Sequence, residues 1–532
     1  MSLPQSNSAW PPHDLQCVYE KLAIWSAWYS GDPDELSGVY GGSTAYDPTG
    51  FFATERGGFR GRVSRALQRF WWGERISPGE RRTKLHIPVA GDIASVSADL
   101  LFSEPPAFTA DNETTNKRLT ELIDDHTHAA LREAAEIAAA LGGVFLRVVW
   151  NADMADKPWI CAEHPDAAVP EFEWGRLSAV TFWSVVHDDG TSIVRHLQRY
   201  EPGRILHGVY VGDRDDLGIA VPLTEYPQTA PLASMVDAEG AIQTGIRGLA
   251  VVYVPNVRPN RLWRDRPAAA QLGRSDFAQL EGLMDNLDEA WSDWMRDLRL
   301  AKARLLVPQT MLDSHGRGQG ASFDLDRELF TGLEGMLQKA GESPITQVQF
   351  KIRTDEHKML TQSLLEQIVR GAGYSMQSFG MNGDTAVTAT EVSARERQSI
   401  TTRGRKINYW KPALAEIIEA LLGIDQVVFK SGVKPQKPDV EFPDAVAEDP
   451  KDLAMTLKML ADARAASTET LVEMLHPDWN DTQQREEVAL IRANPAPAPA
   501  PFQQPPGGPQ PPQQQPGDPN VQPDPNAPPQ AA

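Results

Sequence analysis

The sequence predicts an α+β protein in which two long helices separate a mixed N-terminal region from helical C-terminal regions. Residues 275–300 carry an apolar residue every 3.5 positions, which is typical of a helix that packs against other helices. Between residues 144 and 255 the apolar pattern changes to period two, which is typical of antiparallel strands. At 532 residues the chain is too long for one hydrophobic core, so we expect several domains.

The composition and charge limit the partners and the compartment that we expect for this chain. The chain holds 72 Asp and Glu against 51 Lys and Arg, a formal charge of −21. Because non-specific binding to nucleic acid depends on Lys and Arg, we expect any DNA contact to be local and loose.

Cys17 and Cys161 show neither a disulfide framework nor metal spacing, which favours a reducing cytosol. Residues 1–30 lack a signal-peptide pattern and no apolar run is long enough to span a membrane, so no membrane partner is expected.

Residues 1–270 are predicted to form one α+β domain. An apolar-periodic stretch from Leu15 to Tyr29 indicates a helix, and 84–104 indicates a short strand followed by a helix. Residues 112–141 form a second helical stretch, closed by two glycines, before the period-two runs. The segment Arg60–Trp72 interleaves arginine and aromatic residues. We interpret it as an amphipathic helix that docks on a neighbour rather than as a surface that stacks on nucleic acid.

Residues 275–300 are predicted to form one helix with an apolar seam, flanked by solvent-exposed acidic residues. Ser275 is a good N-cap, and Asp276 suits the positive end of the helix dipole. The seam comprises Phe277, Leu280, Met284, Leu287, Trp291, Trp294 and Leu298. The acidic flanks comprise Glu281, Asp285, Asp288, Glu289, Asp293 and Asp297.

A second helix is predicted at 354–373, with Thr354 as its N-cap and a Gly-Ala-Gly stop at its end. Two long helices that flank a small insertion should run antiparallel. The insertion, 301–353, is predicted to hold strands at 303–308 and 345–353, a flexible loop at 313–322 and a short helix at 330–340. The second helix is expected to bury Leu360, Leu364, Leu365, Ile368 and Val369.

Residues 374–388 are predicted to form a loop with glycines at 380 and 383, followed by a helix at 389–430. A capping box at 388–391 opens this helix, and Lys411-Pro412 should kink it. The helix carries the strongest basic patch of the chain. A solvated or interface-pairing face is favoured for this patch over contact with phosphate. Its members are Arg395, Arg397, Arg403, Arg405, Lys406 and Lys411.

The C-terminal part of the chain divides into a helical and a disordered region. Residues 436–493 are acidic and carry helical apolar patterns. The last segment, 495–532, holds 15 of the 42 prolines among Gln, Gly, Ala and Asn, so it cannot bury a core. We expect it to be disordered.

Catalytic signatures are absent from the sequence. His126 and His128 lie in an Asp-Asp-His-Thr-His run, but on a helix they point about 200° apart, which favours exposed helix surface over a metal site. The glycine loop at 316–320 lacks the GK[ST] of a phosphate-binding P-loop, and no G-x-S-x-G or H-E-x-x-H occurs. We therefore predict no enzyme activity, no cofactor and no metal. A large chain with long helices and no catalytic site is typical of an assembly component.

Six segments carry a resemblance to a known family. They are KLHIPVAGDIASVSADLLFSEPP (84–106), LGGVFLRVVW (141–150), VYVPNVRPNR (252–261), LGRSDFAQLEGLMDNLDEAWSDWMRDLRLAKARLLVP (272–308), GAGYSMQSFG (371–380) and TATEVSARERQS (388–399). In wording and order they resemble the portal proteins of tailed bacteriophages, in particular those of actinobacterial siphoviruses. The likeness runs through most of residues 15–430.

The resemblance implies a phage portal fold assembled as a ring, typically of twelve subunits, at one vertex of the capsid. Its channel would pass double-stranded DNA during packaging and ejection. The implied parts are a wing (1–270 with the kinked helix 389–430), a two-helix stem (275–300 and 354–373), a small α/β clip (301–353), a tunnel loop (374–388), a helical crown (436–493) and the disordered tail (495–532).

The resemblance also implies partners and a location. The partners are other copies of the chain in a dodecamer, double-stranded DNA held non-specifically, the large subunit of the terminase, a head–tail adaptor, the major capsid protein and the scaffold. The location is the portal vertex of the virion, with assembly in the host cytoplasm. Acidic stem flanks would keep DNA sliding, because phosphate repulsion opposes binding. Candidate residues for the DNA channel are Gln377, Ser378, Asn382, Gly383, Asp384, Thr385, Arg395 and Arg397.

Two other classes of function remain alternatives. A head–tail adaptor or minor capsid protein would also be an assembly component, but such proteins are usually shorter and lack the stem–clip–stem order. A packaging enzyme such as an ATPase subunit would need a nucleotide site, and the missing Walker lysine argues against it.

Overall fold

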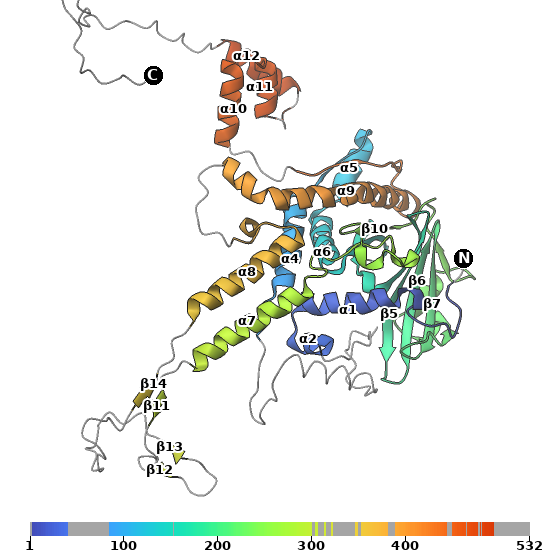
Figure 1. Ribbon diagram of the computed structural model, residues 1–532. Coiled ribbons are helices and arrows are strands. Elements are labelled where there is room, and N and C mark those ends of the chain that lie inside the picture. The colour runs from blue at the N-terminus through green and yellow to red at the C-terminus, as the bar shows by residue number, and fades with distance from the viewer. Residues whose placement is uncertain are drawn as a thin grey trace, which may run out of the picture. The chain divides into compact units, whose positions relative to one another are not determined.

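The computed structural model describes residues 3–40, 85–152, 154–300, 353–380 and 389–443, short strands between 304 and 348, and most of 450–493. Helices and antiparallel sheets alternate in blocks, which confirms the α+β class (Figure 1). The chain divides into two compact units, Met1–Ala447 and Glu448–Ala532. The segment Arg60–Trp72 and the tail 495–532 lie outside the described residues.

Helices near the N-terminus form much of the core of the first unit. α1 (Gln16–Ser30) coincides with the predicted helix, and α2 (Pro33–Tyr40) follows it. α4 (Val89–Phe102) packs against α6 (Asp125–Leu141), with α1 beside both. The short strand expected before α4 does not form. Instead, the backbone N–H groups of Leu85 and Ile87 donate to Ser292 and Asp288, so they are not available for a ladder.

The stretch predicted as one helix at 112–141 is two helices. α5 (Glu113–Leu122) begins at Asn112, whose side chain accepts from the N–H of Thr114. A break follows, and Asp124 caps α6 by accepting from the N–H of Thr127 at 3.0 Å. Asp124 is therefore the N-cap of α6, while α5 ends before Ile123, whose backbone is not helical.

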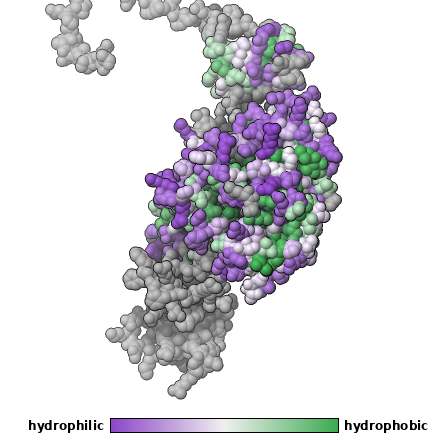
Figure 2. Space-filling model, turned by 90° about the vertical axis from the view of Figure 1, so that its right-hand side faces the viewer, coloured by the Kyte–Doolittle hydropathy of each residue, from purple (hydrophilic) through white to green (hydrophobic). Residues whose placement is uncertain are grey.

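The period-two region forms antiparallel strands, as predicted, and they divide into two sheets. One has the order β10-β2-β3 and the other β4-β5-β6-β7-β8, with β9 paired to β7. Figure 2 shows the face of the unit on the side of the larger sheet, which is mostly hydrophilic with separate hydrophobic areas. The strands are β2 (Gly143–Val149), β3 (Trp159–Glu163), β4 (Ala168–Glu173), β5 (Arg176–Asp188), β6 (Ile193–Glu201), β7 (Arg204–Gly212), β8 (Ile219–Val221), β9 (Ala241–Gln243) and β10 (Val251–Pro255).

Two buried histidines lie side by side on neighbouring strands of the larger sheet. His196 on β6 and His207 on β7 stack with ring centroids 5.4 Å apart, and Nε2 of His196 lies 3.2 Å from Nδ1 of His207. Burial, together with the smaller effect of nearby Arg147, lowers the pKa of each histidine to about 4, and His196 adds to the shift of His207. The fold therefore favours the uncharged pair at neutral pH.

We expect acid to destabilise this sheet through the histidine pair. Protons bind these histidines below pH 6.5 in the unfolded chain but only near pH 4 in the fold. The stabilisation is thus complete above pH 6.5 and is lost as the pH falls toward 4, by up to about 3 kcal/mol per histidine. Urea unfolding at about pH 7 and about pH 5 measures the loss. The His196→Gln/His207→Gln variant should lose less stability than the exposed control His126→Gln, and equal losses would contradict the prediction.

A long helix, α9 (Ala389–Val428), crosses the first unit. Pro412, which was expected to kink the helix, lies inside it, and the helix continues past the proline to Val428. Trp410 and Leu414, on either side of the proline, are buried, and Trp410 meets Phe102 of α4 in an edge-to-face contact at 4.9 Å. This packing holds the helix across the position where the proline removes a backbone hydrogen bond.

Two short ladders lie between residues 300 and 353. β11 (Arg304–Leu306) pairs antiparallel with β14 (Thr346–Val348), at the two predicted strands. β12 (Asp313–Ser314) pairs with β13 (Ala321–Ser322), so the segment predicted as a flexible loop carries a ladder at its ends. The predicted helix at 330–340 lies outside the described residues.

The region predicted to be helical from residue 436 begins with a strand. β15 (Asp439–Glu441) pairs with β1 (Ala107–Thr109) of the first unit. The helices of the second unit follow as α10 (Pro450–Asp462), α11 (Thr468–Leu475) and α12 (Asp481–Ala493). The pairing of β15 could not be read locally, because its partner lies more than 300 residues earlier in the chain.

Candidate functional site

Two long helices, α7 (Glu281–Leu300) and α8 (Thr354–Ala372), form an antiparallel pair (Figure 1). At one end of the pair, Asp297 accepts from Arg353 at 2.8 Å and pairs with His357 at 2.9 Å. At the other end, Leu280 lies so close to Gly371 that an added Cβ would sit 2.7 Å from its Cδ2. The end of one helix thus meets the start of the other, as expected.

α7 begins six residues later than predicted, so the assignment of Ser275 as N-cap is wrong. The hydroxyl of Ser275 donates to the carbonyl of Ala139 at 3.2 Å, and the N–H of Asp276 donates to the same carbonyl at 2.9 Å. Gln279 has a φ of 70°, which lies in the left-handed region and outside the α-helical region. Contacts with α6 therefore hold the approach to α7 outside the helix. α8 likewise starts at Thr354 with Arg353, not Thr354, at the N-cap position.

Burial of the apolar seam decreases along the helix pair. Phe277, Met284 and Leu287 are buried, Leu280, Trp291 and Trp294 are half-buried, and Leu298 is 38% exposed. On α8 the expected burial holds for Ile368 and Val369 and partly for Leu364 and Leu365, but not for Leu360, which is 50% exposed. Near the tip the two helices contact each other through rings such as Trp294 and His357, which stack at 6.1 Å.

The acidic residues that flank the seam of α7 are not all solvent-exposed, which corrects the expectation from the sequence. Asp285 and Asp288 are buried, as is Asp276, which precedes the helix. Asp288 accepts from the N–H of Ile87 at 2.9 Å and pairs with His86 at 2.8 Å. Glu281 accepts from Lys21 and from the indole of Trp25. The acids that remain exposed are Glu289 and Asp293.

A buried ionic network lies where the helix pair meets the rest of the first unit. Nζ of Lys406 donates to Asp276 Oδ2 at 2.5 Å and to Ser97 Oγ at 2.5 Å. The hydroxyl of Tyr374 donates to Asp276 Oδ2 at 2.7 Å, and the amide of Asn256 donates to Oδ1 at 2.8 Å. The network therefore joins α4, the segment after β10, the approach to α7, the segment after α8, and α9.

The charges of this network depend on each other. Burial lowers the pKa of Lys406, while Asp276 opposes this shift. Burial and the Asp276 carboxylate raise the pKa of Tyr374, which keeps its hydroxyl protonated as a donor. Because Asp276 accepts three side-chain donors, its buried charge is both paired and hydrogen-bonded.

Most of the predicted basic patch is not a single surface. Lys406 belongs to the buried network, and Arg403 is buried and donates to the carbonyls of Leu100 and Pro443. Lys411 pairs with Asp439 at 3.2 Å. Arg397 and Arg405 are exposed and line a cleft of about 580 Å³ beside Arg274, whereas the side chain of Arg395 lies outside the described residues.

The remaining channel candidates lie at the start of the predicted loop or beyond what the structure describes. Gln377 and Ser378 belong to a 3-10 turn, η8 (Met376–Phe379), which ends at Gly380 with a φ of 67°. The hydroxyl of Ser378 lies 2.8 Å from that of Ser399 on α9. The structure therefore places two candidates against α9. Asn382, Gly383, Asp384 and Thr385 lie outside the described residues, as does the capping box at 388–391 apart from its helical backbone.

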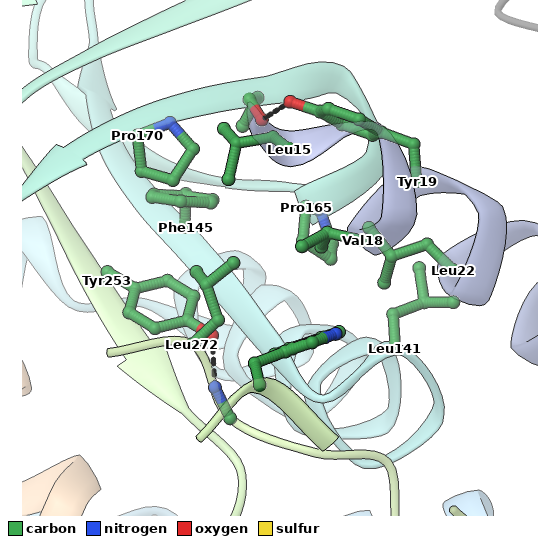
Figure 3. A pocket seen from close by; sticks show the side chains of 13 residues that line it. Leu15, Val18, Tyr19, Leu22, Leu141, Phe145, Pro165, Pro170, Tyr253 and Leu272 are labelled. Atoms are coloured by element: carbon green, nitrogen blue, oxygen red, sulfur yellow. Dashed lines mark hydrogen bonds between the residues drawn. The ribbon is translucent and has the colours of Figure 1, made fainter. Parts of the chain in front are cut away.

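The described part of the chain shows no arrangement of residues that is typical of a catalytic site. No group of three or more His, Cys, Asp or Glu there could hold a metal, and His126 is exposed on α6 while His128 lies 3.2 Å from the carbonyl of Phe102. An apolar pocket between α1 and the small sheet encloses only about 10 Å³ (Figure 3). That space holds at most about one water, so the pocket is a packing gap rather than a ligand site. No described helix is long and apolar enough to cross a bilayer.

Sequence reasoning missed Tyr374, Ser97, Asn256 and Arg274 at this site. One signal was present in the sequence. Lys406 lies in the buried stripe of α9 that includes Ser399, Thr402, Arg403, Trp410 and Ala413, at helical spacings of three and four. A lysine within a buried stripe requires a buried acidic partner, but no local pattern identifies Asp276 as that partner.

Comparisons with known proteins give one family match and similar chains among solved structures. Residues 66–495 match a family described as phage portal protein, SPP1 Gp6-like. A chain in the neck of a native gene transfer agent particle, computed with C12 symmetry, is similar at 12% identity and a TM-score of 0.35, over 75% of this chain and 90% of that chain. A chain of the virion of a native gene transfer agent particle is similar at 11% identity and a TM-score of 0.35, over 91% and 96%. No curated protein matches.

Proposed function

This chain belongs to the SPP1 Gp6-like family of phage portal proteins, and we propose from this premise that it forms a twelve-membered ring around a channel for double-stranded DNA. The family match carries the conclusion, because it spans 66–495 and so includes all helices from α4 to α12. The chain is a portal, or head–tail connector, protein of a virion, in a structural family. Members of the family assemble as homo-oligomers with other virion components.

The parts of a portal are proposed for the elements of this chain as follows. α7 and α8 are the stem, supported by their antiparallel pairing and by exposed apolar groups such as Leu360 near the tip. Residues 301–353, which lie between the two helices, are the clip. Residues 1–270 are the wing, with α9 as its long helix, and α10 to α12 belong to the crown. The tunnel loop is 374–388 and begins at Tyr374 in the buried network.

The channel surface is proposed to include the start of the tunnel loop. Gln377 and Ser378 support this assignment, because their turn is held against α9 through Ser399 and leads directly into residues 382–385. These neutral polar groups suit a wall along which DNA slides, since they offer hydrogen bonds without strong phosphate attraction.

Further partners are proposed from the same premise. The clip would meet the large subunit of the terminase during packaging and a head–tail adaptor afterwards, and the wing would meet the major capsid protein and scaffold. Assembly would take place in the host cytoplasm before the ring enters the virion.

Electron microscopy of the purified chain, with the particle mass measured in parallel, tests the proposed function. We expect closed rings with a mass about twelve times that of the chain, the symmetric assembly of one kind of subunit, and a central hole wide enough for a DNA duplex. The same preparation should not hydrolyse ATP. A monomer that hydrolyses ATP or cuts DNA would instead indicate a packaging enzyme and contradict the portal assignment.

A further inference from the structure

An arginine cleft lies at the base of the helix pair, defined by Arg274, Arg397 and Arg405. It encloses about 580 Å³ between the approach to α7, the end of α8 and one face of α9. Arg397, Thr401 and Arg405 follow one another at every fourth position of α9 and so share this face. The third arginine, Arg274, comes from the segment that precedes α7.

The arginine cleft has a surplus of positive charge within the described chain. Its one lining carboxylate, Asp276, already binds Lys406, Tyr374 and Asn256. No ion pair of the three arginines occurs among the residues that the structure describes, and Nε of Arg274 is buried there without a hydrogen-bond partner. Burial lowers the pKa of Arg274, as do nearby Arg261 and Arg405. An anion entering the cleft would relieve this repulsion.

A complementary acidic surface lies on the outer face of α7. Glu289 and Asp293 are exposed, one helical turn apart, on the side that carries Gly282 and Asn286. Neither carboxylate has an ion pair in the described parts of the chain. Side chains four positions apart are separated by about 6 Å along a helix, and the two arginines of α9, eight positions apart, by about 12 Å. Two carboxylates can therefore lie between those two guanidinium groups.

We propose that the arginine cleft of one subunit receives Glu289 and Asp293 of the adjoining copy of this chain. The inference rests on the proposed ring, in which two different faces of the same chain must meet around the closed circle. The half-buried position of Arg274 favours this partner over DNA. Side chains on a neighbouring helix can enter the cleft, whereas the phosphates of a duplex reach exposed groups.

A charge swap tests the pairing. The variants Arg397→Glu/Arg405→Glu and Glu289→Arg/Asp293→Arg each place like charges together, and we expect each to lower the fraction of subunits in rings at least about tenfold. Combining all four substitutions restores opposite charges, so rings should return. All four residues are exposed, and the thermal melting of the dissociated subunit should change little in each variant. Arg176→Glu, at an exposed arginine of β5, is the matched control and should leave rings intact.

The outcomes separate this inference from the proposed function. Intact rings in both reversed variants would overturn the pairing and leave the portal assignment standing. Intact rings that no longer pass DNA would assign the arginines to phosphate and likewise overturn it. Loss of rings in both variants without recovery in the combination would assign the cleft to another carboxylate. A wild-type chain that forms no ring, alone or with capsid partners, would contradict the proposed function itself.

Discussion

Replacing Lys406 by methionine is expected to lower the free energy of unfolding by about 3–5 kcal/mol. The substitution leaves the Asp276 carboxylate buried with the hydroxyl of Tyr374 and the amide of Asn256 but without its cation. An uncompensated buried charge is the costly result, because the interior solvates it poorly. Denaturant unfolding of the dissociated subunit at fixed concentration measures the change, since assembly would add concentration-dependent stability.

Two comparisons identify the buried pair as the cause. Lys411→Met removes a lysine whose pair with Asp439 is exposed, and its cost should stay below about 1 kcal/mol. The double variant Lys406→Met/Asp276→Asn removes both charges and should lose less stability than the sum of its single variants. Equal effects of Lys406→Met and Lys411→Met would contradict the role assigned to the buried network.

Truncation of Trp410 to alanine is expected to cost about 3–5 kcal/mol. Trp410 is buried on α9 and packs edge-to-face on Phe102 of α4 at 4.9 Å. Phe102 in turn contacts Phe442, which follows β15, so the lost ring leaves a cavity among three elements. The midpoint of denaturant unfolding should fall without a large change in slope, because the exposed surface of the unfolded chain is nearly the same.

The matched control is the other extreme of tryptophan exposure. Trp174 lies in the turn between β4 and β5 and is fully exposed, so Trp174→Ala should change stability by no more than about 0.5 kcal/mol. A small effect at Trp410, similar to that at Trp174, would show that α9 is not held by this contact.

Local patterns in the sequence were sufficient for the family and for most elements. The helical period at Leu15–Tyr29 and the period-two runs from 144 to 255 became α1 and the antiparallel sheets. The positions of α8 and α9 were also predicted closely, because a glycine in the left-handed region ends α8 and strong helical periodicity continues through Pro412. These signals act between residues a few positions apart, and a sequence displays them directly.

The tertiary structure alone decided which charged residues are buried and where α7 begins. Ser275 and Asp276 carry good N-terminal signals, but contacts with Ala139, 136 positions away, hold them outside the helix. The partners Asp276 and Lys406 are separated by 130 positions. Their attraction becomes strong only when packing removes water from both groups. A charged residue in the sequence therefore indicates an exposed face or a buried pair equally well until the fold brings its partner to it.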